Sequence, residues 1–446
     1  MRYKMKKRVY IFMNLIGMSF LYFYMNRATS NIVYSDYIRI INSYLPKYWD
    51  LRNMLSPDIL TRIPLSYLFR FVNCKFFGFN TQFDMIIGLL GILFVSGVVF
   101  SFLYKYDLAI LFSFVIMIVC FSLNKWEMIT NGTGNVHFWA IASTVYTFYL
   151  ADKCFKSDSE SIYQYHRHLL YLLPSFITFI IAGDYCVPFL GTLFIFYSVL
   201  LMRGFNKYRM YLMFSVIFPF GLYVLSRSFA VYEISGASPL SLIEILKIKP
   251  YYIVIFMIKS LASTLVSENL FQVINLRYSK IVIGVVMLLI YTIGIYCYFR
   301  YKFYNKTILP ILLIVYSLIS YVLIFQARWI FNNTNYGMSS RYQLQYQLGV
   351  IGVVLIMGLY HEYVNRKSLI IFMIILPIIL SNIATSLNEW KISPWRKDYS
   401  QKLIYMANNM ETYTDEELEK EFQYGSADKI NKAFAILKEN KLNIFK

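Results

Sequence analysis

Polar and apolar positions alternate along this chain on the scale of whole segments rather than of single residues. Long apolar runs are separated by short clusters rich in Lys and Arg. A run of about 20 mostly apolar residues is the length that crosses a bilayer as a helix. Unpaired backbone amides are costly in hydrocarbon, so runs of this kind must be helical. The pattern therefore predicts an all-α fold, a polytopic transmembrane helical bundle.

We predict about eleven membrane spans, at residues 9–25, 83–104, 108–123, 138–151, 169–182, 186–202, 210–226, 281–299, 308–325, 348–361 and 369–384. A further apolar run, 252–266, carries Lys259 and several hydroxyl side chains, so we expect it to lie at the interface or to re-enter. The first span follows a basic segment and precedes no small-residue cleavage site, which favours a retained anchor over a cleaved signal.

Basic residues in short loops set the orientation of such a bundle. If 252–266 does not cross, the loops on the N-terminal side carry the denser positive charge, which predicts an N-in, C-out topology. If it does cross, the basic loops 300–306 and 362–367 face outward, against the rule. We therefore prefer eleven spans and leave the crossing of 252–266 open.

This topology divides the chain into a transmembrane domain, 1–386, and an extracytoplasmic helical tail, 387–446. The transmembrane domain would have four sizeable outer loops, at 27–82, 124–137, 227–280 and 326–347. In the tail, Thr414 and Glu417 form a capping-box pattern that opens a short helix. Residues 426–439 have the apolar spacing of an amphipathic helix. We expect these small helices to pack against the outer loops.

The overall composition agrees with a membrane protein of this kind. Hydrophobic residues make up 58% of the chain and charged residues 15%, against about 25% charged in ordinary soluble domains. The net charge of +19 is divided between loops on both sides, where lipid phosphates attract it, so we exclude a nucleic-acid partner and expect membrane lipids. The five cysteines show no metal-ligand spacing. The Ile, Lys, Asn, Tyr and Phe bias indicates an AT-rich bacterial genome, and we expect a multi-pass protein of the bacterial inner or plasma membrane.

The first outer loop carries the clearest candidate for chemistry, Asp36, a few residues beyond span one. A carboxylate there can act as general base on a sugar hydroxyl. The alternative is that Asp36 caps the following helix or pairs with Arg39. Farther along, residues 59–79 suit an amphipathic interface helix whose basic residues, among them Arg62 and Arg70, point toward lipid phosphates.

Two later loops and one turn supply candidate binding residues. Trp126 is suited to stack on a sugar or to anchor the interface, beside Glu127, and His137 could bind phosphate or act as an acid. Arg341, followed by Tyr342, offers a planar fork of donors for a lipid phosphate, or else snorkels to headgroups. Asp184 adds a carboxylate in the short outer turn after span five.

This layout resembles the C-type polytopic membrane glycosyltransferases. They too have a long first outer loop with an early acidic residue, as Asp36 here, amphipathic interface helices and a late-loop arginine, as Arg341 here. The resemblance covers 1–384 and implies a polyprenyl-phosphate sugar as donor and a cell-surface glycan or lipid as acceptor on the outer face. Some members have two adjacent acids; here Ser35 and Tyr37 flank Asp36, which leaves open whether a divalent metal ion is needed.

Two other functions fit the composition. O-antigen or capsular polysaccharide polymerases are also aromatic-rich and basic, but they concentrate their large outer loops later in the chain. A glycan flippase or other transporter would carry charged groups near the midplane of its spans. The predicted spans carry almost none. We therefore expect a lipid-linked-sugar-dependent transferase that takes part in polysaccharide biosynthesis.

Overall fold

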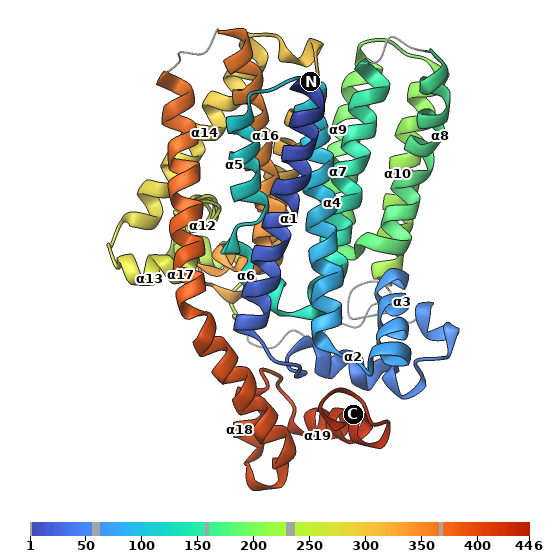
Figure 1. Ribbon diagram of the computed structural model, residues 1–446, viewed down its shortest axis with the longest axis vertical. Helices are drawn as coiled ribbons and strands as arrows, with labels where there is room; N and C mark the ends of the chain where they lie inside the picture. The colour runs from blue at the N-terminus through green and yellow to red at the C-terminus, as the bar shows by residue number, and fades with distance from the viewer. Residues whose placement is uncertain (1, 56–62, 157–159, 229–236, 365–368) are drawn as a thin grey trace.

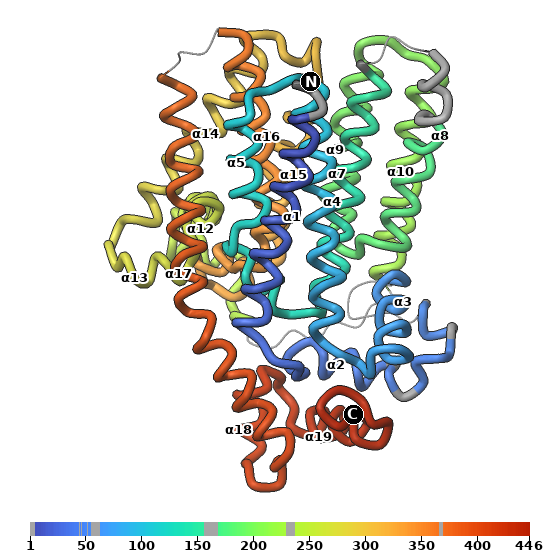
Figure 2. Tube along the Cα trace, viewed as in Figure 1, coloured from blue at the N-terminus to red at the C-terminus, as the bar shows by residue number. Residues whose placement is uncertain are grey.

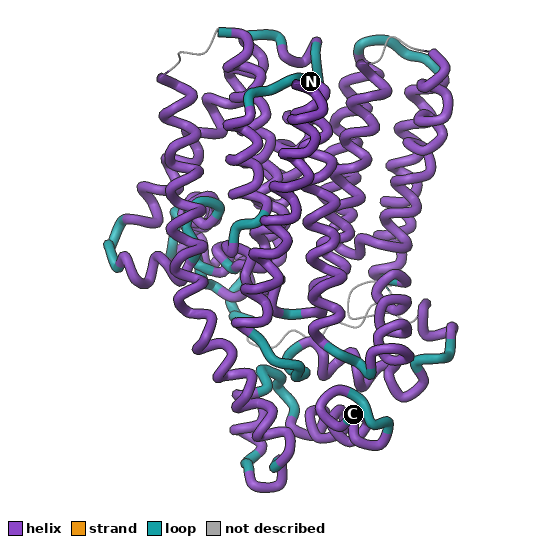
Figure 3. The backbone as a smooth tube through the Cα atoms, in the orientation of Figure 1, coloured by secondary structure: helices purple, strands orange, loops and turns teal. Residues whose placement is uncertain are grey.

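A computed structural model describes residues 2–55, 63–156, 160–228, 237–364 and 369–446. Within these ranges the chain is helical with short connections and has no strand, as Figure 3 shows by colour. The long helices are α1 (Arg2–Ala28), α4 (Thr81–Lys105), α5 (Ile110–Cys120), α7 (Asn135–Lys156), α8 (Glu160–Phe176), α9 (Cys186–Met202), α10 (Lys207–Arg227), α14 (Ser279–Arg300), α15 (Leu309–Arg328), α16 (Gln343–Tyr363) and α17 (Leu369–Asn408). The predicted all-α fold is confirmed.

In the described part of the chain, nine helices are long and apolar enough to cross a membrane, or ten if a bent pair is one span. The chain is therefore a multi-pass membrane protein. The predicted spans 169–182 and 186–202 both fall within one continuous helical stretch, His168–Met202. This stretch contains the turn Gly183–Tyr185, at which Gly183 adopts φ 51°. The predicted span 138–151 lies within α7, which is not among the nine.

Helix α16 forms the centre of the bundle. Of its most apolar 18-residue window, 94% is buried inside the protein, more than for any other candidate span. Glycine makes this packing possible: a Cβ on Gly352 would lie 2.5 Å from the carbonyl oxygen of Pro310 on α15. The two helices can thus approach closely, as small residues allow at helix interfaces in membranes.

Four of the short helices gather at one end of the bundle. Figure 1 shows α2 (Asp36–Tyr44), α3 (Pro64–Val72), α18 (Asp415–Glu421) and α19 (Ala427–Glu439) at the end opposite the N-terminus. We call this the tail end, and the other the N-terminal end. The remaining short helices are α6 (Trp126–Thr130), α11 (Leu242–Ile248), α12 (Tyr252–Ser263) and α13 (Glu268–Ile274). Helices α12 and α13 meet at a bend of 95°, consistent with a re-entrant or broken segment at 252–266.

The tail folds back on the first loop, as the sequence predicts. Helix α17 runs 40 residues without a break, past residue 386, and the chain then returns through α18 and α19 beneath α2 (Figure 2). The predicted capping box between Thr414 and Glu417 is present. One apolar core joins the two regions, with Tyr37 and Phe79 from the first loop and Phe422 and Phe434 from the tail.

Candidate functional site

Six of the residues selected from the sequence line one cavity at the tail end of the bundle. This main cavity has a volume of about 420 Å³. The six are Asp36, Glu127, His137, Asp184, Arg341 and Tyr342. They come from five separate parts of the chain, so the fold, not sequence proximity, brings them together.

Asp36 is the first residue of α2, and its position depends on the tail. The preceding residue, Ser35, adopts φ 54°, a left-handed conformation that is uncommon for a residue other than glycine. The Ser35 amide donates a hydrogen bond of 2.8 Å to the carbonyl oxygen of Phe422. The Asp36 side chain is 44% exposed and has Arg39 Nη2 at 3.8 Å. A partly exposed carboxylate whose ion pair with Arg39 is this long remains available to a ligand.

Arg341 and Glu127 form an ion pair in the wall of the cavity. Nε of Arg341 donates to Glu127, and Ser340 Oγ donates to the other carboxylate oxygen at 3.1 Å. Both charged side chains are partly exposed, at 43% and 24%. The pair therefore holds the guanidinium in place while part of it stays open to the cavity.

Aromatic rings support the other polar residues of the site. The imidazole of His137 stacks on Tyr185 with ring centroids 4.5 Å apart. The neighbouring Asp184 accepts a hydrogen bond from the hydroxyl of Tyr223 on α10. Tyr342 lies under the guanidinium of Arg328, 5.9 Å from its ring centroid. These contacts fix an imidazole, a carboxylate and a second cation around one space.

The structure corrects the expectation for Arg70. We expected it to point toward lipid phosphates, but it is 2% exposed and lines the main cavity. Its helix α3 packs against the bundle, where Arg70 hydrogen-bonds Ser66, one turn earlier. Sequence reasoning missed Arg70 as a site residue, because its burial comes from the packing of α3 against the bundle and not from a pattern in the sequence. Arg62 lies outside the described residues.

Behind Arg70 lies a buried carboxylate that the sequence analysis also missed. Asp84, at the start of α4, is fully buried and accepts hydrogen bonds from Tyr37 Oη and from Asn73 Nδ2, both at 2.9 Å. Burial, and next the nearby Asp84 charge, raise the pKa of the Tyr37 hydroxyl well above its usual value. Tyr37 therefore stays protonated and donates, which ties α2 to the bundle directly beneath Asp36.

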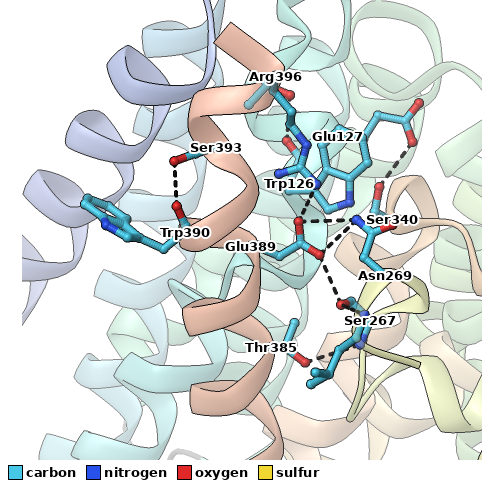
Figure 4. Close-up of polar contacts among 12 residues, drawn as sticks. Trp126, Glu127, Ser267, Asn269, Ser340, Thr385, Glu389, Trp390, Ser393 and Arg396 are labelled. Carbon is cyan, nitrogen blue, oxygen red and sulfur yellow. Dashed lines mark hydrogen bonds and ion pairs between the residues drawn. The ribbon is translucent and has the colours of Figure 1, made fainter. Parts of the chain in front are cut away.

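Trp126 does not line the main cavity but a second one on the other side of the Glu127–Arg341 pair. This second cavity, about 310 Å³, shares Glu127, Asn131 and Arg341 with the first. The Arg396 guanidinium lies 3.6 Å from the ring centroid of Trp126. Figure 4 shows this stack beside the buried Glu389, which accepts hydrogen bonds from Arg396, Ser267 and Asn269.

In net charge, the main cavity favours an anion. Its described lining includes four arginines, Arg39, Arg70, Arg328 and Arg341, against three carboxylates. Among the described residues, no three His, Cys, Asp or Glu side chains are grouped so as to hold a metal ion. Comparison of the chain with models of protein families, with curated proteins and with solved structures finds no match.

Proposed function

We propose that this protein is an integral membrane glycosyltransferase that moves a sugar from a polyprenyl-phosphate donor to a cell-surface glycan or lipid. The observation that carries the proposal is the shared cavity of Asp36 and Arg341, about 300 residues apart in the chain. A base and a phosphate-binding group must lie in one space for this reaction. Nothing local in the sequence forces these two residues together.

The eleven-span, N-in and C-out arrangement belongs to the same proposal. The N-terminus and the tail lie at opposite ends of the bundle in Figure 1, as an odd number of crossings requires. In this arrangement the main cavity opens at the outer face of a plasma membrane. A polyprenyl phosphate could then keep its chain in the lipid while its head enters the cavity.

In the proposed reaction, Asp36 takes the proton from an acceptor hydroxyl as that oxygen attacks the anomeric carbon. The bond between this carbon and the phosphate oxygen breaks, and its electron pair leaves with the lipid phosphate. The Arg341 pair with Glu127 uses Nε, so the phosphate would be bound through the Nη groups. Arg328, Arg70 and Arg39 add positive charge where the leaving group develops its negative charge.

A flippase is the less favoured candidate. Its coupling groups would be expected near the membrane midplane, whereas the charged residues of the main cavity come from the tail end of the bundle. A polymerase would share the transfer chemistry described here. Glycan chain length separates these enzymes: loss of a polymerase removes the ladder of chain lengths on a gel, and loss of a side-branch transferase leaves the ladder in place.

The test is Asp36→Asn, measured as transfer of labelled sugar from polyprenyl-phosphate sugars to surface glycan in membrane vesicles. We expect at least about a 100-fold loss of transfer, the usual contribution of a general base, with unchanged membrane expression. Asp50→Asn is the matched control, because Asp50 lies in the same loop, does not line the cavity and pairs with Arg52 at 2.8 Å. Full transfer by the Asp36→Asn variant would remove Asp36 from the mechanism.

A further inference from the structure

The second cavity is bounded by parts of the chain that are far apart in sequence. The first loop contributes Tyr34, α6 contributes Trp126, α17 contributes Trp395 and Tyr399, and the tail contributes Gln423. Its volume of about 310 Å³ is of the size that small polar ligands occupy. Only the Glu127–Arg341 pair and Asn131 are shared with the main cavity, so the pair forms a common wall.

The charges of the second cavity are already balanced by partners in the protein. Arg341 is paired with Glu127, and Arg396 is paired with the fully buried Glu389 and donates to Tyr24 Oη at 2.6 Å. No further arginine or lysine lines it within the described residues. Each cavity has one more arginine than carboxylates in its lining, but in the second cavity the extra arginine, Arg396, is neutralised by Glu389 just outside the lining. The second cavity therefore offers no unbalanced positive charge to a phosphate and suits a neutral ligand.

Its aromatic side chains are arranged as a platform. The rings of Trp395 and Tyr399 stack at 6.3 Å with an interplanar angle of 17°, and Trp395 is 69% exposed. Tyr399 is held in place by the tail, since its hydroxyl donates to the Glu421 carbonyl and accepts from Gln423 Nε2 at 3.2 Å. An exposed ring on a fixed support presents an apolar face, and the hydroxyl of Ser400 and the amide of Gln423 lie in the same lining. Flat aromatic faces beside polar groups match the apolar faces and hydroxyl edges of sugar rings.

We propose that the second cavity binds a neutral oligosaccharide, the acceptor glycan, with Trp395 as its stacking residue. The acceptor would then lie across the Glu127–Arg341 wall from the anionic donor, and its terminal hydroxyl would reach Asp36 past that wall. This inference rests on the proposed function for the reaction that the glycan enters. The binding site itself stands on the lining, the charge balance and the stacked rings.

The experiment uses the full chain in lipid nanodiscs and two probes. The first probe is a printed array of neutral and acidic oligosaccharides, and the second is a short-chain polyprenyl phosphate measured by calorimetry. We expect binding to neutral glycans that falls at least tenfold in Trp395→Ala, with polyprenyl phosphate binding unchanged. Trp49→Ala is the matched control, because Trp49 is 59% exposed in the first loop, packs against Tyr48 and lies outside both cavities.

The outcomes separate the two proposals. Binding of polyprenyl phosphate without any neutral glycan would overturn the inference and leave the proposed function standing. Binding of neutral glycans that Trp395→Ala weakens, without any binding of polyprenyl phosphate, would support the glycan site and contradict the proposed donor. Equal effects of Trp395→Ala and Trp49→Ala would show that Trp395 only anchors the chain at the interface, which also overturns the inference.

Discussion

Two carboxylates at opposite ends of the bundle, Asp152 and Asp36, have opposite surroundings. At the N-terminal end Asp152 is fully buried and accepts hydrogen bonds from Thr307 Oγ1 at 2.5 Å and from the Ile308 amide at 2.7 Å. Lys105 adds a charge at 3.6 Å. At the tail end Asp36 is 44% exposed, with Arg39 Nη2 at 3.8 Å. A carboxylate surrounded by donors stabilises the fold, whereas one that faces a cavity is available for chemistry.

The largest effect should come from removing the residue that supports the tail end. Phe422 is fully buried, and its carbonyl oxygen accepts the hydrogen bond from the Ser35 amide. Phe422→Ala should destabilise the tail by about 3–5 kcal/mol, the usual cost of this substitution in a core. Transfer should fall with it, because Asp36 loses its fixed position. Limited proteolysis of the tail measures the first effect, and unchanged proteolysis would contradict this account.

The second largest effect is expected at the N-terminal end of the bundle. Asp152→Ala leaves the Thr307 hydroxyl and the Ile308 amide without their acceptor, at about 1–3 kcal/mol for each buried group. We expect a clear fall in the thermal midpoint of the purified protein. Asp36→Asn should leave that midpoint nearly unchanged while abolishing transfer. Equal destabilisation by the two variants would show that Asp36, like Asp152, mainly stabilises the fold.

A smaller effect is expected for Arg341→Lys, which keeps the charge but loses the planar fork of donors. Hydrogen bonds between charged groups contribute about 1.5–3 kcal/mol, so polyprenyl phosphate should bind about 10- to 100-fold more weakly. Calorimetry in nanodiscs measures this change. Arg52→Lys, an exposed residue of the first loop outside both cavities, serves as the control.

The smallest effect is a dependence on alkaline pH. The pKa of Tyr37 is raised by burial and by Asp84. Above pH 10 the unfolded chain loses this proton while the folded chain keeps it, so stability falls as pH rises, by about 1.4 kcal/mol per pH unit. Tyr37→Phe should show a shallower fall above pH 10 in thermal unfolding. Parallel curves for the two proteins would show that Tyr37 does not titrate in this way.

Much of the fold follows from local patterns. Apolar runs specify helices because unpaired backbone amides are costly in hydrocarbon. The tail helices follow from the Thr414–Glu417 capping box and from the apolar face at Ile430 and Phe434. The number of spans is harder to predict, because the turn Gly183–Tyr185 interrupts a long apolar stretch with one charged residue, Asp184, and no basic loop.

The candidate site was only partly accessible from sequence. Asp36 and Arg341 could be placed on one side of the membrane by charge, but the Glu127–Arg341 pair joins residues 214 apart and depends on the packing of α6 against the loop before α16. Glu389 and Arg396 were missed because we assigned them to a soluble tail, whereas α17 carries them along the bundle as a continuous helix. The burial of such charged side chains depends on tertiary packing. The periodicity of apolar residues in the sequence does not predict it.

The hydrogen bond between Ser35 and Phe422 has a consequence for the biosynthesis of the protein. Residues near the start of the chain are held in place by residues added almost 390 positions later. During synthesis Asp36 emerges early, yet its supporting partner exists only after the last long helix has been inserted and α18 has folded. The turn that carries the proposed base therefore forms late, and a membrane that holds only unfinished chains contains no complete candidate site.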